Sequence, residues 1–433
     1  MNLASFPPKT FPVRQITRAP QGHILANRNV WSSDGKSIVY DVRDEETDFT
    51  GNRIERVFVD SGEVEIMYVS PGRSTCGVPT CCPIDDRYVF IHSPLEDEGA
   101  GVTNQWQYCA WHRHGVIGHL SKPQQTWVLD ARDVEPPFTP GALRGGTHLH
   151  MFSPCGKKVA STYEDHVLAI SPAIPRQENR RVIAITMLDR TVSVPRASLN
   201  NLDGSFTAVV TDVVDAPEAG SDQIYRAYSE AWIDSNRLAY QADVRGRSGK
   251  PHSELYVVTL PRDWMRPGPL RLEGTETTRC GVPEGIQMRR LTFTDNDSLP
   301  GLSGPRHWAI ASPDGSWIGC FRRDTAGHSQ FHVVNSLDGE MRQISSHPFS
   351  ATSAFTWHPN GKSVAYVADG SVMQLDLATG EPKRLTPNLD SDAGPTHHAC
   401  IFSPNGDKIA YMQMVQSSHG SHTQLFCVED ICR

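Results

Sequence analysis

Three histidines hold the same place relative to a recurring turn. His148, His307 and His398 each stand six residues before the proline of a Ser-Pro-x-Gly segment, and Asn27 has the equivalent place in a copy with Ser33 at the proline position. Converging neutral imidazoles can ligate a divalent metal or act as general bases. We therefore predict a divalent metal (Mn, Ca or Zn) at His148, His307 and His398. The alternative is that each ring only hydrogen-bonds to backbone in a polar channel.

Cationic and polar residues accompany these histidines. His150 follows His148 at a spacing of two, which on a regular strand places both rings on one face. Arginine is the preferred bidentate partner of a carboxylate. The predicted catalytic residues are Arg144, His148, His150, Arg226 and Tyr228, and the predicted substrate-binding residues are Asn27, Glu230, Arg306 and His397. Together they indicate an anionic small-molecule ligand, although each arginine alone has the ordinary alternative of a surface salt bridge.

The segments that carry these residues repeat along the chain. An aromatic or small apolar residue, Ser/His-Pro, Asx-Gly and an alternating apolar run recur five times, and two degenerate copies make seven. The copies are residues 31–40, 82–91, 152–161, 232–240, 311–320, 357–366 and 402–411. The last turns, at 314, 360 and 405, are 46 and 45 residues apart. This period matches the roughly 40–50 residues of a propeller blade.

Each copy predicts a β-hairpin, because proline followed by Asx-Gly specifies a tight turn between two alternating apolar runs. A second hairpin follows most copies, as in residues 55–68, 332–345 and 372–386. The sequence therefore predicts an all-β fold, a seven-bladed β-propeller of four-stranded antiparallel blades. Trp31, Trp232 and Trp357 recur at one repeat position and are expected to pack between blades.

The chain ends predict how the ring closes. The last copy stops where earlier blades add an outer strand, while residues 12–18 supply a strand of that type. We expect this N-terminal strand to pair with the C-terminal blade, within one domain of residues 1–433. Long intervals predict inserted loops at about 93–125, 170–225 and 260–305. Residues 202–215 are either an eighth inner hairpin or, preferably, the outer part of the third blade.

The composition of the chain narrows the classes of partner and cofactor that we expect. Forty-one basic and 49 acidic residues give a net charge of -8, which offers no footprint for nucleic acid or an anionic membrane. No apolar run is long enough for a secretory signal or a membrane span, so we expect a cytoplasmic protein with reduced cysteines. Gly35-Lys36-Ser37 and Gly361-Lys362-Ser363 are hairpin turns rather than phosphate loops, and we expect no nucleotide cofactor.

The repeat resembles that of TolB-type propellers, with SPDGK…IAY followed by LYVVDL…G…LT. The segments 139–154, 220–232, 274–278 and 289–294 resemble a bacterial family typified by YidR, which implies a fold rather than a reaction. The oligogalacturonate lyases are similar seven-bladed propellers, whose channel holds a divalent metal and whose His and Arg residues abstract the proton α to a uronate carboxylate. Where such a lyase has His-Glu before Trp-His-Pro, this chain has Ser229-Glu230 before Trp232.

Two function classes remain open at this point. One is a protein that binds an anionic small molecule, such as a uronic-acid oligosaccharide, at a His/Arg-rich channel mouth, with a metal-dependent carbon-oxygen lyase as its sharper form. The other is a non-catalytic, TolB-like scaffold that docks a protein partner on its loop face.

Overall fold

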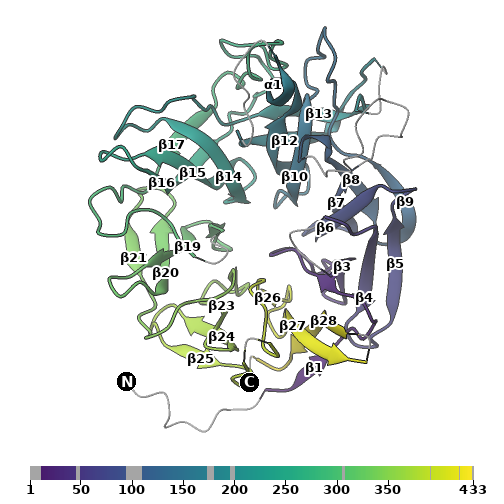
Figure 1. Cartoon of the computed structure of the whole chain (residues 1–433), viewed down its shortest axis with the longest axis vertical. Coiled ribbons are helices and arrows are strands. Elements are labelled where there is room, and N and C mark those ends of the chain that lie inside the picture. Colours follow the sequence, from purple (N-terminus) through teal and green to yellow (C-terminus); the bar gives the residue numbers. More distant parts are fainter. Residues whose placement is uncertain are drawn as a thin grey trace.

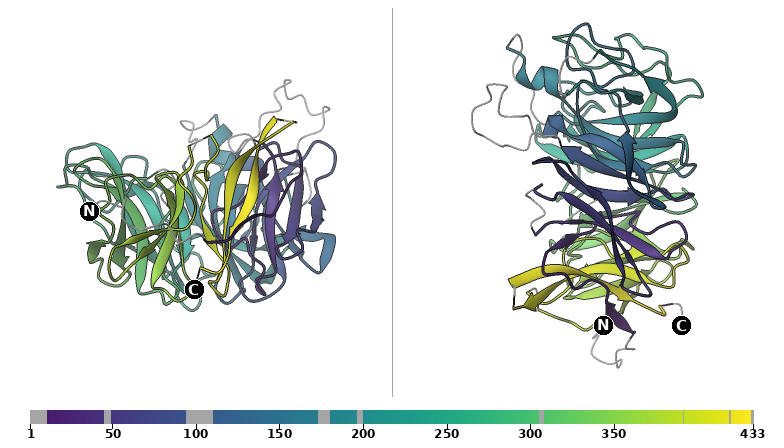
Figure 2. Two further views of the ribbon diagram at one scale, coloured as in Figure 1. Left: turned by 90° about the horizontal axis from the view of Figure 1, so that it is seen from below. Right: turned by 90° about the vertical axis from the view of Figure 1, so that its right-hand side faces the viewer.

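The repeated turns build seven four-stranded antiparallel sheets arranged in a ring (Figure 1). The computed structural model describes residues 11–44, 49–93, 110–172, 180–195, 200–304, 308–390, 392–418 and 420–431. Seen from the side, the sheets stand next to one another like the blades of a thick disc (Figure 2). The predicted all-β, seven-bladed propeller is therefore confirmed.

Each blade contributes one innermost strand and three strands outside it. From the centre outwards, blades 1 to 4 consist of β2 (His23–Ile24), β3 (Ser37–Val42), β4 (Arg53–Phe58) and β5 (Val64–Val69); β6 (Thr75–Cys81), β7 (Arg87–Ser93), β8 (His114–His119) and β9 (Lys122–Val128); β10 (Gly145–Phe152), β11 (Lys158–Asp165), β12 (Val182–Val192) and β13 (Gly204–Val209); and β14 (Ile224–Trp232), β15 (Arg237–Arg245), β16 (Pro251–Thr259) and β17 (Gln287–Arg290).

The remaining blades follow the same plan. Blades 5 to 7 consist of β18 (Ile310–Ala311), β19 (Trp317–Arg323), β20 (Ser329–Asn335) and β21 (Met341–Gln343); β22 (Thr356–Trp357), β23 (Ser363–Ala368), β24 (Ser371–Asp376) and β25 (Pro382–Arg384); and β26 (Ile401–Phe402), β27 (Ile409–Ser417), β28 (Gly420–Val428) and β1 (Val13–Gln15).

The recurring turn joins the innermost strand of a blade to the next strand. Its glycine has a positive φ and donates its N–H to the residue three positions earlier, as Gly156 does to the Ser153 carbonyl at 2.8 Å and Gly315 to Ser312 at 2.9 Å. Glycine meets this conformation without a Cβ penalty. We call the face of the ring that carries these turns the turn face, and the opposite face, where innermost strands begin, the loop face.

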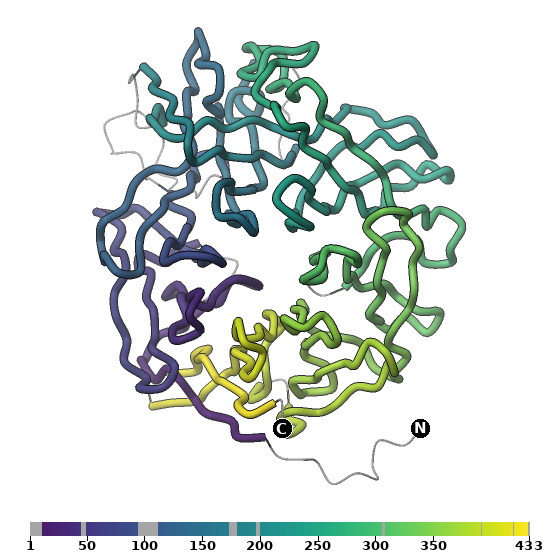
Figure 3. Tube along the Cα trace, turned by 180° about the vertical axis from the view of Figure 1, so that it is seen from behind, coloured from purple at the N-terminus to yellow at the C-terminus, as the bar shows by residue number. Residues whose placement is uncertain are grey.

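The ring closes through its two chain ends. β1 pairs antiparallel with β28, with Val13 opposite Val428 and Gln15 opposite Phe426. Arg14 adds an ion pair to Glu429 at 2.8 Å. Viewed from behind, the purple N-terminal strand lies along the yellow C-terminal blade (Figure 3). The predicted closure by the N-terminal strand is confirmed, and β28 thereby gains a partner along its outer edge.

Adjacent blades pack through apolar faces and a recurring tryptophan hydrogen bond. The indole N–H of Trp31 donates to the Ile401 carbonyl of blade 7 at 3.0 Å, and that of Trp232 to the Met151 carbonyl of blade 3 at 3.0 Å. Trp357 makes the same bond to Ile310 of blade 5 at 2.8 Å. The three tryptophans are therefore blade-packing residues, as predicted.

Three innermost strands contain a bulge at the same repeat position. Val78, Leu149 and Ser229 have φ values of 57°, 60° and 56°, and the strand pairing shifts register at each of them. A left-handed conformation is rare for residues other than glycine, asparagine and aspartate, and most of all for a β-branched one. Such bulges change the direction of the side chains that follow them.

The predicted inserted loops contain strands of the blades. Residues 93–125 include β8, residues 170–225 include β12 and β13, and residues 260–305 include β17. β13 is the outermost strand of blade 3, in agreement with the preferred assignment of residues 202–215. In blades 2 to 4 the third and fourth strands are not joined by the glycine turn of residues 55–68, 332–345 and 372–386, which is why the sequence pattern missed them there. Helix is limited to the 3-10 turn Ala110–His112 and to α1 (His166–Ile170) in the described residues, and neither segment could span a membrane.

Candidate functional site

His148 lies inside the channel wall, part-way along β10. Its side chain is 4% exposed, and neither ring nitrogen has a hydrogen-bond partner among the described residues. Burial holds its pKa well below the usual value, and the charges of Arg113 and Arg181 lower it further. The imidazole is therefore neutral at physiological pH and sits in the positive field of two guanidinium groups.

Arg113 and Arg181 come from the loop-face ends of blades 2 and 3. Each directly precedes the third strand of its blade, β8 or β12. Arg181 Nε lies 3.0 Å from Glu164 Oε1. Burial lowers the pKa of Arg113 to about 9, with Glu164 opposing the shift and Arg181 and Arg43 adding to it. Arg113 and Arg181 thus lie within electrostatic range of each other, of Glu164 and of His148.

A buried carboxylate lies deeper in the channel. Glu230 on β14 is fully buried, and its Oε2 accepts a hydrogen bond from the Thr162 hydroxyl at 2.8 Å. Burial raises its pKa, while Arg28 and then Arg181 oppose the shift. Arg28 is 6% exposed, and burial lowers its pKa to about 10. Glu230 therefore lies within the electrostatic range of a cation from blade 1 and a cation from blade 3.

His150 does not share a face with His148, so that part of the prediction is wrong. Its Nε2 lies 2.9 Å from the Thr147 hydroxyl, which in turn donates to Asp130 at 3.1 Å. Thr147 and His148 are consecutive on the strand and face opposite sides. The bulge at Leu149 turns the His150 ring toward Thr147 and blade 2. Burial lowers the pKa of His150 to about 3, which suits a packed structural imidazole.

The predicted metal ligands are only partly described. His307 and its neighbour Arg306 lie outside the described residues. His398 is 3% exposed, and its Nδ1 lies 3.1 Å from the Thr396 hydroxyl. The histidine set stays a prediction, and the arginines beside His148 make that position unfavourable for a cation.

A different group is the only one among the described residues that brings three possible ligand atoms within 4.8 Å. It consists of His252, Glu254 and Asp295 in blade 4. Arg290 lies between the carboxylates, with Nη2 at 3.0 Å from Glu254 Oε1 and 3.0 Å from Asp295 Oδ2. The guanidinium already supplies positive charge at this place, so the group does not fit a metal.

Arg144 anchors a loop rather than facing the channel. It is fully buried, and its Nε and Nη2 donate to Asp165 at 2.9 and 2.8 Å. Its remaining donors reach the carbonyls of Thr275 and, at 2.8 Å, Thr278. All three guanidinium nitrogens thus donate within the protein, and these four hydrogen bonds use four of the five N–H groups.

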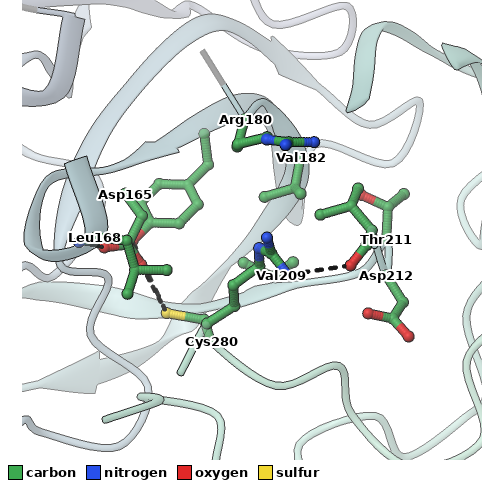
Figure 4. Close-up of a pocket in the computed structure, with 11 residues that line it drawn as sticks. Asp165, Leu168, Arg180, Val182, Val209, Thr211, Asp212 and Cys280 are labelled. Carbon is green, nitrogen blue, oxygen red and sulfur yellow. Dashed lines mark hydrogen bonds between the residues drawn. The ribbon is translucent and has the colours of Figure 1, made fainter. Parts of the chain in front are cut away.

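The loop held by Arg144 covers a small pocket on the outer side of blade 3. Its lining includes Tyr163, Asp165, Arg180, Arg279 and Cys280, and its cavity volume is about 30 Å³. Asp165 and Cys280 lie next to each other in the pocket (Figure 4). Cys280 Sγ lies 4.0 Å from Asp165 Oδ2. Burial raises the pKa of the Cys280 thiol to about 12, so it is not a nucleophile at neutral pH.

Arg226 and Tyr228 are paired with a single carboxylate. Arg226 Nη2 lies 2.6 Å from Asp243 Oδ2, and the Tyr228 hydroxyl donates to Asp243 Oδ1 at 2.8 Å. Both residues lie on β14 ahead of its bulge at Ser229. Their donors are therefore partly satisfied within blade 4.

The remaining predicted residues lie at the junction of blades 1 and 7. Asn27 is buried and accepts the Ala399 N–H at 2.9 Å, which ties the two blades together. His397 is exposed, and its ring centroid lies 4.4 Å from that of His398. Of all predicted residues, the structure brings His148 and Glu230 to the described arginine-rich part of the channel.

The sequence pattern missed the arginines that dominate this region. Arg28, Arg113, Arg181 and Glu164 are not among the residues predicted for the site. Arg28 lies one residue after Asn27. Arg181 directly precedes the apolar run of β12, a signal that marks the loop-face end of a strand.

Comparisons with known proteins agree with this architecture. Residues 75–201 match a family described as a protein of unknown function (DUF3748). Over 407 residues the chain is 38% identical to Escherichia coli (strain K12) YidR, covering 93% of this chain and 95% of YidR. The structure of an oligogalacturonate lyase in complex with manganese aligns with a TM-score of 0.56 at 12% identity, covering 96% of this chain and 92% of the lyase.

A second solved lyase gives the same picture. The oligogalacturonate lyase of Vibrio parahaemolyticus aligns with a TM-score of 0.56 at 9% identity, covering 97% of this chain and 93% of that one. At such identities the likeness shows a shared fold. The resemblances predicted from the sequence, to the YidR family and to the lyase propellers, are confirmed at that level.

Proposed function

Because the chain belongs to the YidR family and its channel is lined with arginine and histidine, we propose that it binds an anionic small molecule at Arg113, Arg181 and His148. The observation that carries this proposal is that two guanidinium groups from neighbouring blades, Arg113 and Arg181, both act on the buried, neutral imidazole of His148. A bound anion would be attracted by both guanidinium groups, and low-dielectric surroundings strengthen that attraction.

We propose a carboxylate as the anionic group, carried by a uronic-acid oligosaccharide. Guanidinium groups match a carboxylate with paired, parallel hydrogen bonds. The fold shared with an oligogalacturonate lyase supports the same ligand class. The whole chain has a net charge of -8, so it does not attract anions in general. Attraction of an anion is therefore expected only where positive side chains cluster.

Calorimetric titration with galacturonate oligomers tests the proposal, with neutral glucose oligomers as the ligand control. Arg113→Gln or Arg181→Gln should weaken binding about tenfold, the equivalent of ~1.4 kcal/mol. Arg342→Gln is the matched control, because Arg342 pairs with Glu340 on an outer strand, away from the channel. Equal binding of neutral and acidic oligomers, or unchanged affinity in both channel variants, would overturn the proposal.

A narrower form of the proposal makes the chain a lyase for such oligosaccharides. Elimination needs a base that removes the proton α to the carboxylate. His148 is the imidazole in place, and an anion bound beside it would raise its pKa from its present low value. Ultraviolet absorbance of an unsaturated product, lost in His148→Gln, is expected. Binding without this absorbance would reject the lyase and leave the binding proposal standing.

A second candidate function is a scaffold for a protein partner. Val64, Ile66 and Val69 on edge strand β5 are 44–45% exposed, and Trp127 on β9 is 43% exposed beside them. Clustered exposed apolar side chains mark interaction surfaces. If this function is the main one, Ile66→Lys should abolish binding of the protein partner, and Arg113→Gln should leave it unchanged. Partner binding that is kept in Ile66→Lys and lost in Arg113→Gln would reject this function.

A further inference from the structure

The turn face carries a pocket at the end of the central channel, distinct from the arginine pair of the loop face. It is formed by the ends of the innermost strands and the following turns of blades 1, 2, 5, 6 and 7, and its cavity volume is about 430 Å³. Its walls include Trp31, Pro83, Ile310, Trp357 and Phe402. This wall is mostly apolar, and tryptophan indole N–H groups there already donate to neighbouring blades.

One charged residue lines this pocket among the residues that the structure describes, and it is Arg28. The side chain is 6% exposed, and its two terminal nitrogens have no hydrogen-bond partner in the described part of the chain. Its guanidinium carbon lies 5.0 Å from the ring centroid of Trp308. Burying a guanidinium without acceptors is costly, so a group at this place is expected to receive acceptors from outside the chain.

The charge of Arg28 is balanced only at a distance. Glu230 opposes the burial-driven fall in the pKa of Arg28, but no ion pair within 4.0 Å joins the two in the described residues. Glu230 already accepts a hydrogen bond from Thr162. The Glu230 carboxylate therefore weakens the positive field of Arg28 without accepting hydrogen bonds from it.

The backbone beside Arg28 is held by a hydrogen bond to the next blade. Asn29 has a φ of 53°, and its carbonyl accepts the Cys81 N–H at 2.6 Å. Asparagine tolerates this left-handed conformation. The bond to blade 2 thus fixes the segment from which the Arg28 side chain projects.

We propose that this turn-face pocket is a second binding site, for an amphipathic monocarboxylate whose carboxylate pairs with Arg28 and whose apolar body lies between Trp31, Trp357 and Phe402. The two terminal nitrogens of Arg28 are buried and have no hydrogen-bond partner in the described part of the chain, and a pair of guanidinium nitrogens matches the two oxygens of a carboxylate. A phosphate dianion fits less well, because Glu230 repels a second negative charge and no other cationic side chain among the described lining residues offsets it. An oligosaccharide would leave many hydroxyls against apolar walls.

The test is a titration of the full-length protein with octanoate, followed by calorimetry or tryptophan fluorescence. Octan-1-ol, of equal chain length and without charge, is the ligand control. We expect octanoate to bind at least tenfold more tightly than octan-1-ol. No binding of octanoate, or equal binding of both, would overturn the proposal in the unmodified protein.

Variants then assign the binding to Arg28. Arg28→Gln should reduce octanoate affinity at least tenfold and leave octan-1-ol binding unchanged, while Arg28→Lys keeps part of the preference for the charged ligand. Arg113→Gln, which tests the loop-face site, should leave octanoate binding unchanged. Wild-type affinity for octanoate in a folded Arg28→Gln variant would overturn the assignment. If Arg28→Gln does not fold, the octanoate affinity of Arg28→Lys tests the assignment instead. In the unmodified protein, octanoate should then bind more tightly than octyl phosphate, and tighter binding of octyl phosphate would count against the proposal.

Discussion

At the scale of single residues, the innermost strands carry buried ionisable groups whose pKa values are shifted by their surroundings. His148, Arg28 and Arg113 all have lowered pKa values with burial as the largest cause. Burial of this kind favours neutral imidazoles and leaves guanidinium groups charged but in need of an anion. The chemistry of the channel is thus better suited to holding an anion than to holding a cation.

This balance predicts how binding responds to a chelator. The positive charge that meets the ligand comes from Arg113 and Arg181, so EDTA should leave the affinity for galacturonate oligomers unchanged. Calorimetry with and without EDTA measures this. A loss of affinity that added Mn²⁺ restores would show instead that the predicted histidine site holds a metal needed for binding.

Buried histidines also predict a loss of stability in acid. Burial, aided by Arg132, lowers the pKa of His92 to about 4, and the ring packs 5.0 Å from that of His114. Below about pH 6.5 the unfolded chain takes up a proton that folded His92 refuses until about pH 4. The free energy of unfolding should therefore fall as the pH drops through this range, by ~1.4 kcal/mol per pH unit for such a group.

Urea unfolding between pH 7 and pH 4.5 measures this dependence. In His92→Gln the free energy of unfolding should depend less steeply on pH, because glutamine does not titrate and the contribution of this one group is lost. Exposed His397→Gln is the control and should keep the original slope. An identical slope in His92→Gln would contradict the assignment.

At the scale of elements, the innermost strands decide where the channel side chains point. Five turns with glycine at positive φ could be predicted from the sequence, because four have Asx-Gly, which specifies that conformation, and Cys155-Gly156 holds the same place after Ser-Pro. The bulges at Val78, Leu149 and Ser229 could not, since no glycine marks them. The direction of the His150 side chain depends on such a bulge, which is why regular alternation placed it on the same face as His148, whereas its catalytic role stays a prediction.

The bulges also predict an unusual response to glycine. Ser229→Gly should leave the free energy of unfolding unchanged or raise it by up to about 1 kcal/mol, because glycine removes the strain of a left-handed residue. Ala231→Gly, on the same strand and absent from the residues with positive φ, should lower it by about 1 kcal/mol. Chemical denaturation of both variants measures the difference, and equal losses would contradict strain at Ser229.

At the scale of the whole molecule, the closure by β1 joins segments from opposite ends of the chain. Besides the strand ladder, the Thr17 hydroxyl donates to Gln424 Oε1 at 2.9 Å, and Ile16, 2% exposed, packs in the core between blades 1 and 7. The terminal strand could be predicted because both a missing outer strand and an orphan strand were visible in the sequence. The channel arginines could not, since they lie in different blades with no shared motif.

Removal of residues 1–18 tests the closure. The truncated chain exposes the edge of β28, and we expect a lower melting temperature and aggregation that increases with concentration. Removal of residues 1–10 alone leaves every described contact of β1 in place and serves as the control. Light scattering after size exclusion and thermal melts measure both effects; an unchanged melting temperature in a monomeric 1–18 deletion would contradict the role of β1.

The same closure orders the events of synthesis. Arg14 and Glu429 are 415 residues apart in sequence, so β1 is synthesised long before its partner strand β28. Six blades can assemble as they emerge, while the nascent protein stays an open crescent with an unfilled edge. A chaperone that shields unpaired strands would be needed most in this interval, between completion of the sixth blade and release of the final one.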